Sequence, residues 1–243
     1  MDIPVSGMDI DLYWPKDSLE WLGHCPVCGD GRRAVEHERL LDNVFRCAPG
    51  KWTLFRCQGC RAGYLDPRPT PDSIGLAYRR YFTHAPENRA SLEELNWMRR
   101  LRRALANGYR NHYYGTDERP ASPLGTVLLK LLPSQRALID AEARGLRKVL
   151  PGARLLDVGC GNGAFLDFAR RAGWKVTGVD PDPLAVDAAR KKGLDVQLGG
   201  VEVLVGFENT FVGITLGHVV EHLHDPLYTL QTCYRLLKPG GWL

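Results

Sequence analysis

Long apolar stretches are scarce in this sequence of 243 residues. The longest one, residues 127–132, is interrupted by Lys130 and is far shorter than the roughly 20 apolar residues that cross a bilayer as a helix. Residues 1–11 contain acidic side chains and no basic start followed by an apolar core, so we expect no secretory signal peptide. No internal repeat or low-complexity tract is present. We therefore expect a globular protein without a membrane span.

A strong charge of one sign is also missing. The formal net charge is only +4, so charge alone does not indicate a nucleic-acid partner. Cysteine occurs seven times, an odd number, and four of the seven form two close pairs. This pattern argues against a disulfide framework and favours a bound metal in the reducing cytoplasm. The length allows one medium domain and one small one.

The two cysteine pairs have the spacing of a zinc ribbon. Cys25 and Cys28 form one Cys-x-x-Cys pair, and Cys57 and Cys60 form a second pair after 28 intervening residues. Each pair can direct two thiolates toward one ion, so the four sulfurs complete a tetrahedral site for structural Zn²⁺. A redox dithiol is the alternative, but two pairs favour zinc.

Short strands are expected between the cysteine pairs, at residues 44–46 and 52–56. A segment of this size has little core of its own. Structural zinc supplies on the order of 10–16 kcal/mol of apparent binding energy in such modules. The fold of this segment should therefore depend on the metal.

The middle of the chain is expected to be helical. Ser91 and Glu94 form a capping box at the start of a helix that ends near Gly108, and a second helix covers residues 134–150. The first helix carries four arginines: Arg99, Arg100, Arg102 and Arg103. These arginines form either a solvated helix face or a basic wall for the phosphate groups of an anionic acceptor.

Strand and helix patterns alternate in the last part of the chain. Apolar strand patterns cover residues 155–158, 175–179, 195–198 and 211–216. Helical patterns separate them, and Asp182 with Pro183 begins one helix as N-cap and first residue. The alternation predicts an α/β fold with a doubly wound, mostly parallel sheet, whose ligands bind at the carboxyl ends of the strands.

The patterns divide the chain into three parts. Residues 1–72 are expected to form a zinc-ribbon-like segment, residues 73–150 a helical lid or linker, and residues 151–243 a Rossmann-like domain.

A glycine turn follows the first strand of that domain. Asp157 lies near the strand end, and Gly159, Gly161 and Gly163 come before the next helix pattern. Glycines at such a turn let the bare backbone approach a ligand at a helix N-terminus. Asp180 ends the next strand about 20 residues beyond the first glycine, where its carboxylate could bind two ribose hydroxyls.

These residues resemble those of the class I S-adenosylmethionine-dependent methyltransferases. The glycine turn resembles their motif I, residues 178–181 their ribose-binding strand end, and residues 236–241 the turn before their fifth strand. Residues 65–71 and 78–82 resemble a bacterial group of these enzymes that carries an amino-terminal zinc-binding segment. The resemblance implies contacts with the cofactor from Asp157, Gly159, Cys160, Gly161, Gly163, Asp180, Pro181 and His218.

The sequence also departs from this family. It ends at Leu243, where the fifth strand should begin, whereas the family fold continues with two further strands. We therefore expect a truncated chain with a bare apolar sheet edge and with impaired cofactor binding or activity. The acidic residue that often contacts adenine is absent between residues 199 and 212, where Glu202 and Glu208 are only loose candidates.

A histidine-rich segment follows the fourth strand. His218, Glu221 and His222 have the spacing i, i+3 and i+4, so a helical turn would place them on one face. The segment resembles the Glu-x-x-Glu-His sequence with which ubiquinone-pathway O-methyltransferases bind Mg²⁺. His218 replaces the first glutamate, which weakens the case for that ion.

Three roles for this segment remain open. His222 is the first candidate, as a general base, because a neutral imidazole can accept a proton at cytoplasmic pH. The three side chains could instead hold a divalent ion. Glu221 and His222 could also only brace the loop against the cofactor.

Together these patterns predict methyl transfer from S-adenosylmethionine to a hydroxyl or carbon of a small anionic acceptor. Sugars and lipid-linked metabolites, phosphorylated or nucleotide-linked ones included, fit this description. Two alternatives stay open: a zinc-dependent RNA or nucleic-acid-binding methyltransferase, whose affinity would fall steeply with salt, and an inactive scaffold that binds cofactor. The modest net charge argues against the nucleic-acid alternative.

Overall fold

The computed structural model describes residues 14–44, 46–78, 96–146, 148 and 152–243. The chain divides into two compact units. We call the first, residues 1–82 with Leu223–Leu227, the cysteine unit, and the second, residues 83–222 with Tyr228–Leu243, the sheet unit. No helix among the described residues is long and apolar enough to cross a membrane.

The cysteine unit consists of short strands around the two cysteine pairs. Its elements are η1 (Lys16–Ser18), β1 (Leu19–Glu20), β2 (Arg33–Leu40), β3 (Trp52–Cys57), β4 (Gly63–Leu65), β5 (Arg68–Pro69) and α1 (Gly75–Tyr78). Strands β2, β3 and β4 form one antiparallel sheet, and β1 pairs with β5 in a second. The expected strand at residues 52–56 is confirmed as β3.

The expected strand at residues 44–46 is not found at Val44 or Arg46, and Phe45 lies outside the described residues. The partner of β3 is β2, which lies directly after the first cysteine pair. Asp42 explains the difference, because its carboxylate accepts hydrogen bonds from the backbone N–H groups of Val44, Cys47 and Ala48. A backbone wrapped around one carboxylate cannot offer the same groups to a neighbouring strand.

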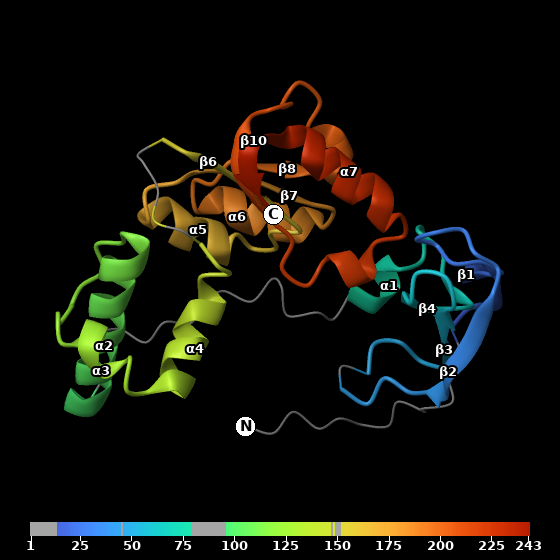
Figure 1. Ribbon diagram of the computed structural model, residues 1–243, viewed down its shortest axis with the longest axis horizontal. Coiled ribbons are helices and arrows are strands. Elements are labelled where there is room, and N and C mark those ends of the chain that lie inside the picture. Colours follow the sequence, from blue (N-terminus) through green and yellow to red (C-terminus); the bar gives the residue numbers. More distant parts are fainter. Residues whose placement is uncertain (1–13, 45, 79–95, 147, 149–151) are drawn as a thin grey trace. The chain divides into compact units, whose positions relative to one another are not determined.

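The sheet unit contains a five-stranded sheet in the order β10-β9-β6-β7-β8, drawn in yellow to red in Figure 1. Its strands are β6 (Arg154–Val158), β7 (Lys175–Asp180), β8 (Val196–Leu198), β9 (Phe211–Thr215) and β10 (Leu237–Trp242). All neighbouring strands are parallel. The order reverses at β6, so the carboxyl ends of β6 and β9 flank the crevice where ligands of such sheets bind. The predicted α/β class is confirmed.

Helices follow the strands as the alternation predicts. They are α5 (Ala164–Arg171), α6 (Pro183–Lys191) and α7 (Pro226–Leu236), with the short turns η4 (Val201–Val203) and η5 (Val220–His222). Asp182 caps α6 as expected, because its carboxylate accepts a hydrogen bond from the N–H of Leu184 at 2.9 Å. On β6, Leu155 packs into the core that includes α5, whereas Leu156 packs with α7.

The carboxyl-terminal residues differ from the expected turn. Residues 237–242 form β10, which pairs in parallel with β9. A Cβ atom on Gly213 of β9 would meet the ring of Trp242, so the missing side chain lets this ring lie on the sheet. The start of the fifth strand is therefore part of this chain.

Three helices precede the sheet: α2 (Trp97–Tyr114), α3 (Gly125–Leu128) and α4 (Pro133–Glu142). The expected capping box at Ser91 and Glu94 lies outside the described residues. Helix α2 begins after Asn96, whose side chain accepts a hydrogen bond from the N–H of Arg99. It does not end near Gly108 but continues to Tyr114. Gly108 is needed for packing, because a Cβ atom there would overlap the backbone of Ser122.

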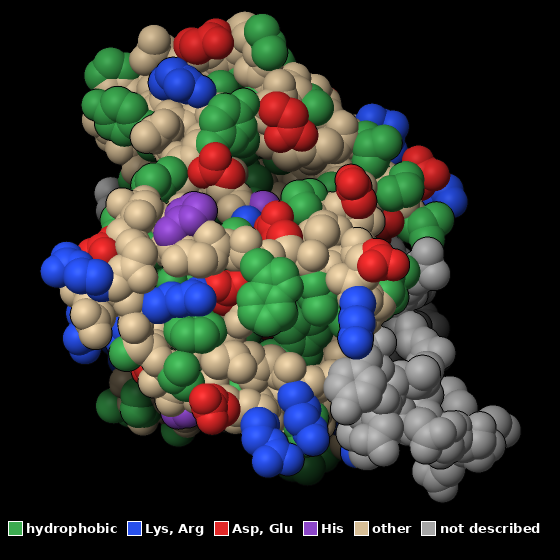
Figure 2. Space-filling model, turned by 90° about the vertical axis from the view of Figure 1, so that its right-hand side faces the viewer, with side chains coloured by type: hydrophobic (Ala, Val, Ile, Leu, Met, Phe, Trp, Pro, Cys, Tyr) green, Lys and Arg blue, Asp and Glu red, His purple; other side chains and the backbone are tan. Residues whose placement is uncertain are grey.

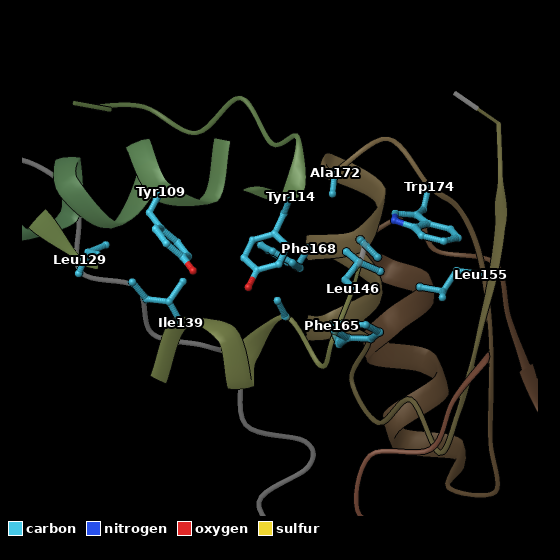
Figure 3. Packing of buried hydrophobic residues seen from close by; sticks show 12 residues of the cluster. Tyr109, Tyr114, Leu129, Ile139, Leu146, Leu155, Phe165, Phe168, Ala172 and Trp174 are labelled. Carbon is cyan, nitrogen blue, oxygen red and sulfur yellow. The ribbon is translucent and has the colours of Figure 1, made fainter. Parts of the chain in front are cut away.

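These helices share a core with α5 and the sheet. Tyr109, Ile139 and Phe168 come from α2, α4 and α5 and point into one interior in Figure 3. The hydroxyls of Tyr109 and Tyr114 both donate hydrogen bonds to Asp140, at 2.9 and 2.5 Å. Tyr109 and Tyr114 are therefore buried beneath the helices.

Candidate functional site

The glycine turn lies at the carboxyl end of β6, the central strand. Gly159, Gly161 and Gly163 all have left-handed backbones, with φ of 68°, 55° and 74°. L-residues with side chains adopt this conformation at a cost of about 1–2 kcal/mol each. The turn therefore requires glycine at these positions for conformational reasons alone.

The three glycines differ in what surrounds them. A Cβ atom on Gly159 would overlap Val219, and one on Gly163 would overlap Leu194. A Cβ atom on Gly161 would meet no other atom within 4 Å. Two of the glycines thus make room for the protein's own side chains, and only Gly161 borders open space. The backbone cradle for a ligand is therefore centred on Gly161.

Asp180 is turned toward this cradle from the end of β7. Its Oδ2 accepts a hydrogen bond from the N–H of Gly161 at 2.7 Å, and its Oδ1 accepts one from the N–H of Asp182 at 2.9 Å. Pro181 lies between these two acidic residues. The structure thus brings the predicted ribose-binding carboxylate to the glycine turn.

Cys160 is placed differently from its neighbours. Its side chain is buried with Leu166 and Val186, and burial raises the pKa of its thiol. A Cβ atom on Gly178 would press against this sulfur. A contact between Cys160 and a ligand in the turn would therefore come from the backbone and not from the thiol.

Asp157 lies at the centre of the sheet and is fully buried. It faces Thr215 of β9 in the strand register, and the Thr215 hydroxyl donates a hydrogen bond to its Oδ1 at 2.7 Å. Arg144 Nη1 donates to both carboxylate oxygens, at 3.0 and 3.2 Å. Burial raises the pKa of Asp157 to about 6, and Arg144 and Thr215 act in the opposite direction.

Arg144 is the site residue that the sequence patterns missed. Its guanidinium lies over the ring of Phe165 at 4.6 Å from the centroid, and a Cβ atom on Gly217 would press against it. Arg144 and Gly145 both have left-handed backbones, with φ of 46° and 69°. The available signal was the Arg-Gly pair that interrupts the helix expected over residues 134–150.

The histidine-rich segment is exposed. His218 has a left-handed backbone and a side chain that is 93% exposed, with Nδ1 at 3.6 Å from Glu221 Oε1. Glu221 and His222 belong to the short 3-10 turn η5 and not to an α-helix. A metal site needs at least three His, Cys, Asp or Glu side chains whose ligand atoms lie close together. Among the described residues, only a group of four cysteines meets this condition. The divalent-ion alternative for His218, Glu221 and His222 therefore has no converging set of ligand atoms in the described structure.

Those four cysteines, Cys25, Cys28, Cys57 and Cys60, lie together as predicted. All four sulfurs lie within 4.8 Å of one another, and two of the Sγ–Sγ distances are 3.6 and 3.5 Å. Four sulfurs around one tetrahedral Zn²⁺ at about 2.3 Å would be spaced by about 3.8 Å. The donor set and its size therefore fit zinc.

Backbone N–H groups donate hydrogen bonds to two of the four cysteine sulfurs. The N–H of Val27 lies 3.4 Å from Cys25 Sγ, and the N–H of Gly59 lies 3.3 Å from Cys57 Sγ. The Cys60 N–H group has the largest effect on Cys57 and lowers the pKa of that thiol to about 7. At Cys60 the Ala62 N–H group also lowers the pKa, but the Cys28 thiol and burial outweigh it and raise the pKa. Thiolate is the form of cysteine that binds metals.

A buried acid braces the loop before the first cysteine pair. Asp66 accepts hydrogen bonds from the N–H groups of Leu22 and Gly23, at 3.0 and 3.1 Å, and from the Arg33 guanidinium. Burial raises the pKa of Asp66, but these three partners outweigh it and lower the pKa below its usual value. Asp66 belongs to residues 65–71, which carry part of the family resemblance, and it supports the loop that leads to Cys25.

Comparison with known proteins points to the same kind of domain. Residues 125–243 match the family model described as a methyltransferase domain. The ubiquinone biosynthesis O-methyltransferase of Xanthomonas campestris pv. campestris is 40% identical over 104 residues, which are 40% of this chain and 44% of that protein. The protein of the same name from Alkalilimnicola ehrlichii is 36% identical over 99 residues, or 38% and 40% of the two chains. This chain spans less than half the length of these relatives.

Solved structures of related domains cover a similar share. An S-adenosylmethionine-dependent methyltransferase from Mesorhizobium loti is 25% identical, with 44% of this chain and 51% of that chain covered and a TM-score of 0.39. One from Archaeoglobus fulgidus is 26% identical, with 45% and 48% covered and a TM-score of 0.35.

Proposed function

We propose that the protein transfers a methyl group from S-adenosylmethionine to a hydroxyl of a small molecule. The proposal starts from residues 125–243, which form an S-adenosylmethionine-dependent methyltransferase domain. A carbon acceptor is the second choice. The sequence relatives are named O-methyltransferases, which favours oxygen as the acceptor atom.

The observation that carries the proposal is the open space at Gly161 beside the Asp180 carboxylate. No atom occupies the position of a Cβ on Gly161, and the N–H of the same residue holds Asp180. A ligand can therefore contact bare backbone and a carboxylate at one point. Asp180 would bind the ribose hydroxyls of the cofactor, and Gly161 would lie against its methionine part.

Asp157 and Arg144 supply opposite charges close to the same turn. The methionine part of the cofactor carries one ammonium and one carboxylate group. We assign Asp157 to the ammonium, through water or through the turn that it orients, and the half-buried Arg144 to the carboxylate. A paired acid and base that are already held in place bind a zwitterion with little reorganisation.

When bound, S-adenosylmethionine supplies a methyl group on a sulfonium, which is already an excellent leaving group. The protein's main task is then to align an acceptor in line with the S–CH₃ bond, and such positioning contributes about 7–11 kcal/mol in favourable systems. A hydroxyl acceptor also has to lose its proton. His222, in η5 directly beyond β9, is the base that we propose, and His218 and Glu221 would orient it.

We further propose that the four cysteines hold one structural Zn²⁺. All four ligand positions are filled by protein sulfurs, so such an ion has no open position for substrate chemistry. The acceptor would be a small anionic metabolite, such as a sugar or a lipid-linked intermediate. The modest net charge and the arginines of α2 allow an anionic acceptor without indicating nucleic acid.

Calorimetry with S-adenosylhomocysteine tests the cofactor site. We expect Asp180→Ala to weaken binding by at least about tenfold, the loss expected for one charge-assisted hydrogen bond. Asp187→Ala is the matched control, because Asp187 is an exposed acid on α6 with no assigned role. Equal affinities of both variants and the unchanged protein would contradict the proposed ribose contact.

Methyl transfer itself is tested separately, with labelled S-adenosylmethionine and a panel of hydroxyl-containing acceptors. Turnover that is lost in His222→Ala, while S-adenosylhomocysteine still binds, would support the proposed base. Cofactor binding without turnover on any acceptor would favour the inactive scaffold instead.

A further inference from the structure

Positive charge is concentrated in one segment of the sheet unit. Residues 96–139 contain eight Lys or Arg and two acidic residues, a formal net charge of +6, whereas the whole chain carries +4. On the face shown in Figure 2, by contrast, acidic and basic side chains are interspersed. Five of these eight basic residues lie on α2 and none lies on α3, so the excess positive charge of this segment is concentrated on α2.

Four of these charges lie on the first turns of α2. Arg99, Arg100, Arg102 and Arg103 form no ion pair with any residue that the structure describes. Three of them are exposed and Arg103 is half-buried. Like charges this close repel one another, so an anionic partner would stabilise this end of the helix.

Large apolar side chains are exposed on α2, on α3 and directly before and after α3. Trp97 at the start of α2 is 72% exposed, and Leu131 after α3 is 73% exposed. Six more exposed apolar residues accompany them: Met98, Leu101, Leu124, Val127, Leu128 and Leu132. Single exposed apolar residues are ordinary, but a contiguous group on a folded protein marks an interaction surface.

The backbone packing places these side chains in one area. A Cβ atom on Gly108 would overlap Ser122, and one on Gly125 would overlap Leu105. Sequence numbers thus rise along one segment as they fall along the other, so the two segments run antiparallel. Continued by one turn of α2, this register puts Leu128 at the level of Leu101, and a second turn puts Leu131, which follows α3, at the level of residues 97–99. Buried Tyr109 and Leu129 anchor the two segments to the core.

We propose that this surface, formed by the exposed residues 97–103 and 124–132, docks on a lipid bilayer that contains anionic lipids. Trp97, Met98 and Leu101 share one side of α2, and their side chains would enter the boundary between headgroups and acyl chains. Arg100 and Arg102 flank this side of the helix and would contact the phosphates. This combination of basic and apolar side chains is what interfacial helices use. The proposal uses no residue of the cofactor site, but it gives the arginines of α2 the phosphates of a bilayer as partner instead of those of a small anionic acceptor.

Two other occupants explain the residues less well. A nucleic acid would account for the arginines but leave Trp97, Leu124 and Leu131 exposed. A second copy of this chain would cover the apolar side chains but would bring two groups of four arginines together. Only an anionic, apolar surface complements both features.

Co-sedimentation of the full chain with vesicles tests the proposal. We expect binding to phosphatidylcholine vesicles that contain phosphatidylglycerol, little binding to pure phosphatidylcholine, and a decrease with salt. Replacing Arg99, Arg100, Arg102 and Arg103 by Gln should lower the partition coefficient by at least about tenfold, given the contribution of each basic residue near an anionic surface. The matched control removes four other exposed charges, with Lys51→Gln, Lys175→Gln, Lys191→Gln and Lys238→Gln, and should retain binding.

A second measurement locates the contact on the protein. Brominated phosphatidylglycerol should quench tryptophan fluorescence in the unchanged protein, and Trp97→Phe should remove that quenching while sedimentation persists. Absence of vesicle binding, equal binding to neutral vesicles, or equal loss in the lysine control would each overturn the proposal. If the protein does not bind vesicles, two further results would overturn the proposal in favour of another occupant. One is RNA binding, and the other is a dimer that the double substitution Trp97→Ser and Leu131→Ser dissociates.

Discussion

The cysteine unit and the sheet unit are stabilised in different ways. The sheet unit buries three separate clusters of apolar side chains around a five-stranded sheet. The buried cluster of the cysteine unit contains Cys25, Cys57 and Tyr64, and most of β2 is exposed. Trp14 and Trp52 are the other large buried side chains among the described residues of this unit, so its core is small and includes two of its own candidate metal ligands. One chain thus combines a unit stabilised by burial with a unit that we expect to depend on a bound metal.

The comparison predicts its largest effect for removal of zinc. Chelation, or Cys57→Ser, should unfold the cysteine unit, because apparent zinc binding energies in such modules are on the order of 10–16 kcal/mol. Hydrogen exchange should then accelerate in residues 14–78 and 223–227, while the core strands of the sheet unit stay protected. Elemental analysis should find about one zinc per chain. Cys47→Ser is the control, since Cys47 lies in the same unit outside the four-sulfur cluster.

The next largest effect should come from Asp66. Asp66→Asn removes the charge that Arg33 and two backbone N–H groups share, and breaking a buried ion pair costs about 3–5 kcal/mol. Hydrogen exchange near Leu22 and Gly23 should accelerate, with less effect on the sheet unit. Asp72→Asn is a suitable control, because Asp72 is exposed. Equal protection in both variants would show that coordination alone holds this unit.

A pH dependence should distinguish the sheet unit. The pKa of Asp157 is raised to about 6, so the folded protein binds this proton more tightly than the unfolded chain does. The free energy of unfolding should therefore fall as pH rises from about 4 to about 6, by on the order of 3 kcal/mol. Urea unfolding between pH 4.5 and 7.5 measures it. Asp157→Asn should flatten this part of the profile, and an unchanged slope would contradict the assignment.

The smallest expected effect is a difference in stability between alanine substitutions at two glycines of the same turn. Gly161→Ala should cost about 1–2 kcal/mol of stability, because of its left-handed backbone, and should weaken S-adenosylhomocysteine binding by filling the cradle. Gly163→Ala should cost about 1–3 kcal/mol more, because its Cβ atom would overlap Leu194. Thermal unfolding and calorimetry compare the two variants. Equal stability losses would mean that Gly163 is not required for packing.

Local signals predicted much of this fold. The alternation of strands and helices indicated the parallel sheet, and Asp182 with Pro183 marked the start of α6. The two Cys-x-x-Cys pairs indicated the four-sulfur cluster. Each of these features depends on residues that are near one another in the sequence or on a period that the sequence displays directly.

Other signals were wrong because distant residues overrode them. Gly108 would end a helix in isolation, but it lies inside α2 because the backbone of Ser122 passes against it. Residues 44–46 have the composition of a strand, yet the Asp42 carboxylate takes up the backbone N–H groups around them. Neither competitor is visible in a pattern of apolar periodicity.

The amino-acid sequence by itself thus determined the fold class, the cysteine cluster and the position of the glycine turn. Only the tertiary structure decided that Arg144 meets Asp157, and that Gly161 alone among the three glycines borders open space. The physical reason is that these roles depend on which atoms lie opposite one another after strands and helices pack. Side chains such as Val219 and Leu194 reach the turn from parts of the chain that no local pattern connects to it.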